Sequence, residues 1–113
     1  MKKFIALFMA MLLIALALVS FSSCNKKDDT FKVGVVHIGD PADGSGYSYT
    51  HDVGIVDMQK NLGLKDDQII RKLNIADDDE AAIRQAIEDC ISEGCNIIFT
   101  TSYGYMDTTA ALA

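Results

Sequence analysis

Residues 31–52 decide the fold, and they read FKVGVVHIGDPADGSGYSYTHD. The first eight, residues 31–38, are β-branched and almost wholly apolar, which is typical of a strand buried on both faces of a sheet. A Gly-Asp-Pro turn signal at residues 39–41 ends this strand. A helical pattern begins within residues 48–52, so the glycine-rich and tyrosine-rich stretch between is predicted to be a loop joining a buried strand to a helix.

Two more strands follow along the chain. Residues 68–75 alternate between apolar and polar side chains, which indicates a strand near the edge of a sheet with one wetter face. Residues 96–101 read NIIFTT, and this β-branched run predicts a third strand, buried like the first.

The same periodicity predicts three helices. The first begins within residues 48–52 and ends before Gly63, the second covers residues 81–91 and ends before Gly94, and only the beginning of the third is present. Asp77 is expected to cap the second helix, with Glu80 completing a capping box. Asp107 is expected to cap the third.

The order of these elements is β-α-β-α-β-α, which predicts an α/β fold. Right-handed crossovers place strands one and three side by side and strand two at the edge. The result is a three-layer open parallel sheet with strand order 2-1-3. The segments that follow strands one and three should then meet at the carboxyl edge of the sheet, where open α/β sheets bind ligands.

Those two segments hold every tyrosine of the chain, and they also hold many hydrogen-bonding side chains. The aromatic faces come from Tyr47, Tyr49, Tyr103 and Tyr105, and the donors and acceptors from Ser48, Thr50, His51, Ser102 and Asp107. A flat heteroaromatic molecule needs aromatic faces for stacking and a few polar groups around its rim. The predicted site therefore suits a flat, polar small molecule, with one or two of the tyrosines touching it.

The sequence gives less support to an enzyme active site or a metal site than to a ligand-binding site. No Gly-x-Gly-x-x-Gly follows the first strand, and the glycines near residue 45 do not form a nucleophile elbow. The three consecutive aspartates at residues 77–79 lack the spacing of a calcium loop, so a helix cap is the favoured reading. A lone His37 in a buried strand is expected to be a satisfied core residue. We therefore predict a binding protein without cofactor or metal.

Two cysteines lie in the predicted domain. Cys90 falls on the apolar face of the second helix, and Cys95 lies just before the third strand. Export permits a disulfide between them, but two buried small side chains are the favoured interpretation.

The N-terminus has the pattern of an exported protein. Lys2 and Lys3 precede an unbroken apolar run at residues 4–19, and small residues then lead to Cys24. An uncleaved membrane anchor is the alternative, because the run is almost long enough to span a bilayer. We assign residues 1–23 to a signal peptide, 24–30 to a polar tether and 31–113 to the domain.

The charge balance argues against one class of partner. Ten Lys and Arg against sixteen Asp and Glu give a formal net charge of −6. An acidic chain without a basic patch is not expected to bind nucleic acid.

Several of these motifs together resemble one family. The sequence Ser-Ser-Cys ending at Cys24 resembles the lipobox of bacterial lipoproteins. Together with KVGVV at residues 32–36, DGSGYSYTHD at 43–52 and IIFTTSYGYMD at 97–107, it resembles the basic membrane protein (BMP) family. These lipoproteins look like purine-nucleoside receptors of ABC importers.

The resemblance implies a fold, a ligand and partners. The chain would be the first part of a type I lobe similar to the periplasmic binding proteins, with a purine nucleoside or nucleobase held between two lobes. Tyr47 matches the aromatic residue that stacks on the base, and Asp107 matches the acid that the family uses toward the sugar. Ser48 stands where many members have asparagine, and residues 49–52 resemble a subgroup expected to prefer a free base. The ligand-binding set is thus Tyr47, Ser48, His51, Ser102, Tyr103 and Asp107.

The family also implies a location. Acyl chains on Cys24 would anchor the protein to the plasma membrane, facing the extracytoplasmic side, beside an ABC permease and its ATPase. Family members are about three times longer, so we expect a fragment with marginal stability. Two alternatives stay open: an exported sensing lobe that signals to a membrane partner without transport, and a truncated product without function.

Overall fold

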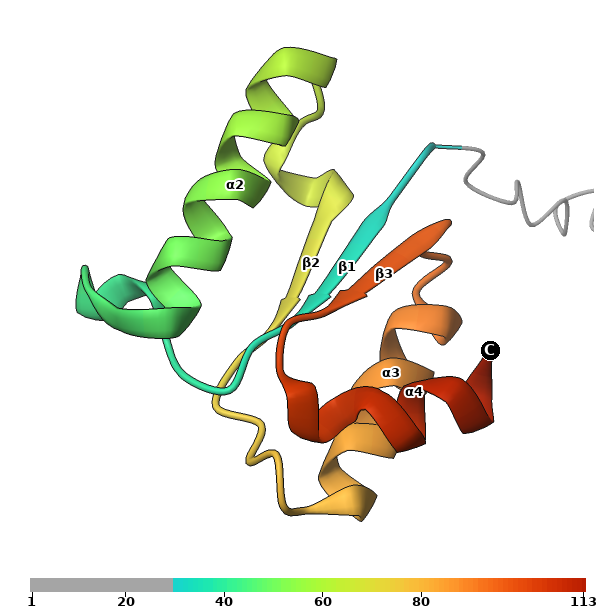
Figure 1. The fold of residues 1–113 in the computed structure, drawn as a ribbon. Helices are drawn as coiled ribbons and strands as arrows, with labels where there is room; N and C mark the ends of the chain where they lie inside the picture. The colour runs from blue at the N-terminus through green and yellow to red at the C-terminus, as the bar shows by residue number, and fades with distance from the viewer. Residues whose placement is uncertain (1–29) are drawn as a thin grey trace, which may run out of the picture.

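A computed structural model describes residues 30–113, and it contains a three-stranded parallel sheet (Figure 1). The strands are β1 (Val33–Val36), β2 (Ile69–Lys72) and β3 (Ile97–Thr100). Their order is β2-β1-β3, with both pairs parallel, which confirms the predicted α/β sheet and its order. The predicted signal peptide and Cys24 lie outside the described residues.

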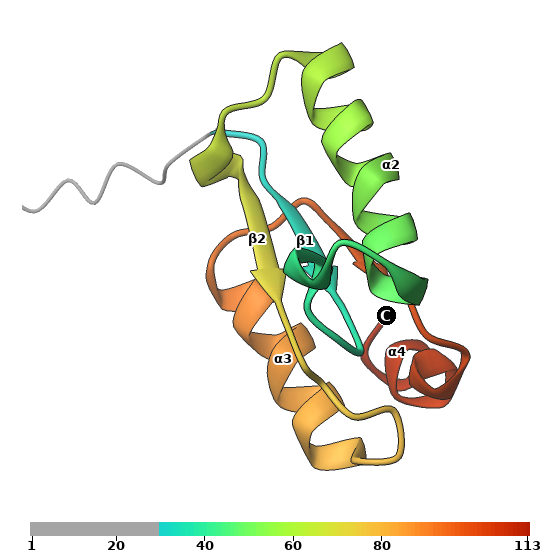
Figure 2. The same cartoon turned by 90° about the vertical axis from the view of Figure 1, so that its left-hand side faces the viewer.

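Helices cover both faces of this sheet, which gives the predicted three layers (Figure 1 and Figure 2). Helix α2 (Gly46–Leu62) packs on one face, and α3 (Glu80–Ser92) and α4 (Met106–Leu112) lie together on the other. Three short 3-10 turns join the elements: η1 (Pro41–Asp43), η2 (Asp66–Gln68) and η3 (Tyr103–Tyr105). Within residues 30–113, none of the helices has the length and apolar character needed to cross a bilayer.

The core forms on both sides of β1, because alternate residues of a strand point to opposite faces. Val33 and Val35 pack toward α2 with Ile55 of that helix. Val36 packs on the other face with Ile83 and its neighbours on α3. All four residues of β1 are buried, so the prediction of a strand buried on both faces is confirmed.

Gly34 lets α3 approach β1 closely. A Cβ at this position would lie 3.0 Å from both the Cβ and the Sγ of Cys90, which is tighter than ordinary van der Waals contact. Cys90 is completely buried there, and Cys95 is partly buried. Both cysteines are free thiols. The favoured interpretation of two buried side chains is confirmed for Cys90, whereas Cys95 is only partly buried.

Helix α2 begins earlier than the sequence pattern predicted. Gly44 has a left-handed backbone (φ 71°) and Ser45 is extended, so the chain turns within two residues and the helix starts at Gly46. Its first two turns therefore hold the tyrosine-rich segment that was expected to be a loop. The side chains of residues 47–51 consequently leave the helix with helical spacing.

The predicted capping box of α3 is wrong. Asp79, not Asp77, is the N-cap residue, and its side chain accepts a hydrogen bond of 3.0 Å from the backbone N–H of Ala82. Asp77 instead accepts a bond of 2.8 Å from the Ser102 hydroxyl. The residue directly before Glu80 is the one that can reach the N–H groups of the first turn, so it takes the capping role.

Asp107 does not cap the last helix. The chain passes through η3 first, and the Ser102 side chain caps that turn by accepting a bond from the N–H of Gly104. Helix α4 then continues directly from the 3-10 turn, which places Asp107 in its first turn.

Strand β3 is more exposed than predicted. Ile97 is 43 % exposed and Phe99 is 37 % exposed, although both lie in the middle of a strongly apolar run. Within the described residues β3 pairs only with β1 and forms an edge of the sheet. The side chains at alternate positions of β3 therefore keep partial contact with solvent.

Candidate ligand-binding site

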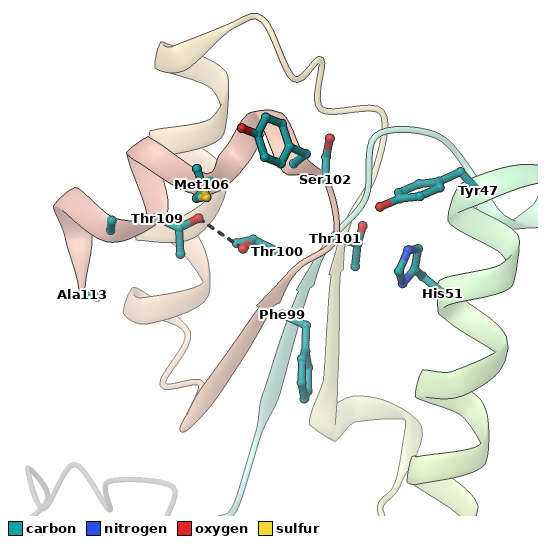
Figure 3. A pocket seen from close by; sticks show the side chains of 11 residues that line it. Tyr47, His51, Phe99, Thr100, Thr101, Ser102, Met106, Thr109 and Ala113 are labelled. Carbon is teal, nitrogen blue, oxygen red and sulfur yellow. Dashed lines mark hydrogen bonds between the residues drawn. The ribbon is translucent and has the colours of Figure 1, made fainter.

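A cavity of about 720 Å³ lies at the carboxyl edge of the sheet (Figure 3). One side comes from the start of α2, and the other from the end of β3 and the segment through α4. The two segments predicted to meet at this edge do meet there. The lining consists of Tyr47, His51, Phe99, Thr100, Thr101, Ser102, Tyr103, Met106, Thr109, Ala110 and Ala113.

Tyr47 and His51 form the aromatic side of the cavity. They lie one turn apart on α2, with ring centroids 4.4 Å apart and ring planes at 63°, an edge-to-face contact. Figure 3 shows both rings pointing from α2 toward the end of β3. Tyr47 is 56 % exposed and Tyr103, across the cavity, is 84 % exposed. Aromatic faces on both sides are thus open to a flat molecule.

Hydroxyl groups form the opposite side of the cavity, which we call the hydroxyl wall. It consists of Thr100, Thr101, Ser102 and Thr109. The Thr101 hydroxyl donates to the backbone oxygen of Val36 at 2.9 Å. The Thr109 hydroxyl donates to the backbone oxygen of Tyr105 at 2.7 Å. The same Oγ1 atom lies 3.2 Å from the hydroxyl oxygen of Thr100. The hydroxyl wall therefore has a fixed arrangement before any ligand arrives.

A partly buried chain of polar side chains contacts the hydroxyl wall at Thr101. The Nδ1 atom of His37 lies 3.3 Å from the Thr101 hydroxyl, and its Nε2 atom lies 3.2 Å from Oδ1 of Asp52. Arg71 donates to both carboxylate oxygens of Asp52, at 2.7 and 3.4 Å. His37 is completely buried with a partner at each ring nitrogen, so the prediction of a satisfied core histidine is confirmed.

Ser48 lies outside this cavity. Its side chain is buried, and its hydroxyl accepts a bond of 2.9 Å from the backbone N–H of Gly39. It therefore holds the turn after β1 against the first turn of α2.

The four tyrosines divide between several places. Tyr49 lies on another side of α2, in a separate shallow hollow beside Pro41. Tyr105 is completely buried and donates a hydrogen bond of 2.5 Å to the backbone oxygen of Ile75. Burial raises the pKa of Tyr105 to about 12, with a smaller contribution from the charge of Asp77. Of the four tyrosines, Tyr47 and Tyr103 line the cavity.

Asp107 also lies away from the cavity. It borders a different hollow, beside Asp77, Glu80 and Gly104. The structure thus brings together four of the six residues predicted to bind ligand and leaves Ser48 and Asp107 elsewhere. The four that line the cavity are Tyr47, His51, Ser102 and Tyr103.

Several cavity residues escaped the sequence prediction. Thr100 and Thr101 belonged to a run interpreted as a buried strand, and Phe99 to the middle of that run. The available signal was position, because the last residues of a parallel strand border the site at its carboxyl edge. No sequence pattern places Met106 and Thr109 at the cavity, because their position there depends on how α4 packs. Within residues 30–113, no group of three or more His, Cys, Asp or Glu side chains is placed to hold a metal ion.

Comparison with known proteins gives one informative likeness. No family model matches the chain. The chain is similar to a purine-binding protein. That protein comes from Brucella abortus (strain 2308) and is 35 % identical over 86 residues, which make up 76 % of this chain. The match covers 23 % of the relative's length, so this chain spans only a part of what the relative contains. The likeness supports a relationship with purine-binding proteins.

Proposed function

We propose that this chain supplies one side of a binding site for a purine base or nucleoside. The observation that carries the proposal is the cavity in which the Tyr47 and His51 rings face a wall of hydroxyl groups. A purine is flat and carries hydrogen-bonding atoms around its rim, so aromatic faces and a polar wall complement it. The likeness to a purine-binding protein supports the same ligand class.

The exposure of the aromatic residues bears on how the ligand would be held. Tyr103 is 84 % exposed, so a purine stacked on it from within this chain would stay open to solvent on one side. We propose that polypeptide outside residues 30–113 supplies an opposing surface, as in a two-lobed clamp. The much greater length of the relative is consistent with this arrangement.

The N-terminal sequence and the family resemblance support a proposal for the wider role in the cell. We propose a lipoprotein anchored through Cys24 on the extracytoplasmic side of the plasma membrane, which delivers its ligand to an ABC permease and ATPase. The apolar run at residues 4–19 and the small residues before Cys24 support export and lipidation. The protein would act as a binder and not as an enzyme.

Calorimetry of the full chain in detergent tests the ligand. Adenine, adenosine, guanosine and inosine are titrated beside uracil and cytidine as matched pyrimidines. At least one purine should bind, and should bind more tightly than either pyrimidine. Binding of no purine, or equal binding of purines and pyrimidines, would overturn the proposal.

Labelling with tritiated palmitate tests the anchor. The wild-type chain should take up label and sediment with membranes, and a Cys24→Ser variant should lose the label. A Cys90→Ser variant is the matched control and should keep the label, because the residue it changes lies buried in the domain. Label that persists in Cys24→Ser would rule out the proposed acylation site.

Uptake of a labelled purine by cells tests transport. Deletion of the gene should abolish high-affinity uptake if the protein serves an importer. Unchanged uptake together with a lost transcriptional response to purine would instead support the sensing role.

A further inference from the structure

The direction of each hydrogen bond in the hydroxyl wall determines what the wall can offer to a ligand. A hydroxyl group has one proton to donate and two lone pairs that accept. A carboxylate or carbonyl oxygen can only accept, so a hydroxyl group that is hydrogen-bonded to one must be the donor in that bond. The partners of Thr101 and Ser102 allow this accounting to be completed.

The Ser102 hydroxyl donates its proton to a carboxylate. Its Oγ atom lies 2.8 Å from Oδ2 of Asp77, and the carboxylate accepts the bond. The N–H of Gly104 donates to the same Oγ at 3.4 Å. What Ser102 retains for the cavity is one lone pair and no proton.

The Thr101 hydroxyl also has no proton left for a ligand, because its partners within the protein take it. Its Oγ1 atom lies 2.9 Å from the backbone oxygen of Val36 and 3.3 Å from Nδ1 of His37. The Asp52 carboxylate can only accept, so Nε2 of His37 donates to it, and Nδ1 of the neutral ring is an acceptor. The hydroxyl proton of Thr101 then goes either to Val36 or to Nδ1, and none is left for any other partner. In both cases the proton stays inside the protein and only lone pairs can serve a ligand.

Thr100 is less constrained than its two neighbours. Thr109 has one proton and two acceptors nearby, the backbone oxygen of Tyr105 at 2.7 Å and Thr100 Oγ1 at 3.2 Å. When the shorter bond takes the proton of Thr109, the Thr100 hydroxyl keeps its own proton for Thr109 or for a ligand. The hydrogen bonds therefore fix Thr101 and Ser102 as acceptors and leave Thr100 able to donate or accept.

We propose that Thr101 and Ser102 determine specificity as obligatory hydrogen-bond acceptors, and that the ligand turns an edge rich in N–H groups toward them. The inference rests on the proposed function and narrows it to purines that carry an exocyclic amino group. If the ligand edge carried only acceptor atoms, they would face the lone pairs of the Thr101 and Ser102 oxygens. Both sides would then lose their hydrogen bonds to water without gaining a new one, which weakens binding. Tyr47, Tyr103 and His51 are on other parts of the cavity and can donate to the ring nitrogens.

The inference is tested by calorimetry with adenine and unsubstituted purine, which differ by one amino group. The full chain should bind adenine about tenfold more tightly, as expected for one net hydrogen bond. N6,N6-dimethyladenine, which keeps the nitrogen but lacks its N–H groups, should also bind more weakly than adenine. The Ser102→Ala and Thr101→Val variants should reduce the preference for adenine over purine. Ser92→Ala is the matched control, since Ser92 lies on α3 and does not line the cavity.

The outcomes separate this inference from the proposed function. Equal affinity of the wild-type chain for adenine and purine would overturn the acceptor role while leaving purine binding intact. A preference for adenine that is unchanged in both variants would overturn it as well. Binding of neither ligand, nor of any other purine, would count against the proposed function itself. If Thr101→Val fails to fold by circular dichroism, the partly exposed Ser102 still provides the test.

Discussion

The Nε2 atom of His37 lies 3.2 Å from Oδ1 of Asp52, and this contact joins the end of β1 to the second turn of α2. Arg71 on β2 holds the same carboxylate at 2.7 Å. Three elements thus meet at one side chain that is 14 % exposed. Because Tyr47 and His51 project from the same helix turns, the contact also fixes the aromatic side of the cavity relative to the hydroxyl wall.

Removal of the Asp52 carboxylate should therefore destabilise the fold. Asp52→Ala leaves the ring of His37 and the guanidinium of Arg71 without their shared acceptor, at a cost of about 2 kcal/mol in the free energy of unfolding. Urea denaturation followed by circular dichroism measures this cost. Asp57→Ala, on an exposed position of the same helix, is the control and should change stability by less than about 0.5 kcal/mol. Equal effects of the two substitutions would show that the contact contributes nothing.

Tyr47 should contribute to binding through its ring. Tyr47→Ala should weaken the affinity for a purine by about 1–3 kcal/mol, the range found when an aromatic residue that stacks on a base is removed. Tyr49→Ala is the matched control, because Tyr49 lies two residues further along α2 and outside the cavity. Calorimetry of both variants with adenine measures the difference. Affinity that is unchanged in Tyr47→Ala, or reduced equally in both variants, would remove Tyr47 from the site.

Much of the fold could be predicted because its signals are local or topological. The apolar run that became β1 was long enough to indicate burial on both faces, and the alternation of strand, helix and turn residues fixed the order of the elements. Right-handed crossovers in a doubly wound sheet, with helices on both faces, then gave strand order 2-1-3. The meeting of Tyr47 with Tyr103 at one edge followed from that order, without knowledge of any contact.

The parts that could not be predicted depend on contacts between distant segments. Three consecutive aspartates precede α3, and sequence alone could not show that Asp77 is engaged by Ser102, twenty-five residues further on. Asp107, in the first turn of α4, borders the hollow beside Asp77 and not the cavity, which the sequence could not show either. The start of α2 was placed too late because the helix begins with Gly46, Tyr47 and Ser48, a poor helix-forming sequence that its tertiary contacts override.

Close packing of η3 against the segment before α3 gives another prediction. A Cβ on Gly104 would lie 2.6 Å from the backbone oxygen of Asp77, so Gly104→Ala forces backbone to move and should cost about 1–3 kcal/mol. Gly54→Ala is the control: it lies inside α2 with nothing within 4 Å, and should stabilise the fold by about 0.5–1 kcal/mol. Thermal unfolding should therefore shift in opposite directions for the two alanine substitutions. A Gly104→Ala variant as stable as the wild type would mean that η3 and Asp77 are not in contact.

Tyr105 should make stability depend on pH in the alkaline range. Burial raises its pKa from the ordinary value of 10.0 to about 12 in the folded chain. The folded state therefore favours the protonated phenol, so this contribution is complete below pH 10.0 and is lost as the pH rises toward 12. Burial also raises the pKa of Cys90 from 9.0 to about 12. The ionisation of this thiol therefore also lowers the stability of the fold as the pH rises.

Tyr105→Phe isolates the share of the tyrosine, because Cys90 is unchanged in it. The variant lacks the bond to the backbone oxygen of Ile75 and should be less stable than the wild type by about 1 kcal/mol at neutral pH. Phenylalanine has no proton to lose, so the stability advantage of the wild type should shrink between pH 10.0 and about 12. Urea denaturation at a series of pH values measures both free energies, and absorbance of the phenolate follows the ionisation itself. An advantage that stays constant across this range would show that Tyr105 ionises equally readily in the folded and unfolded chains.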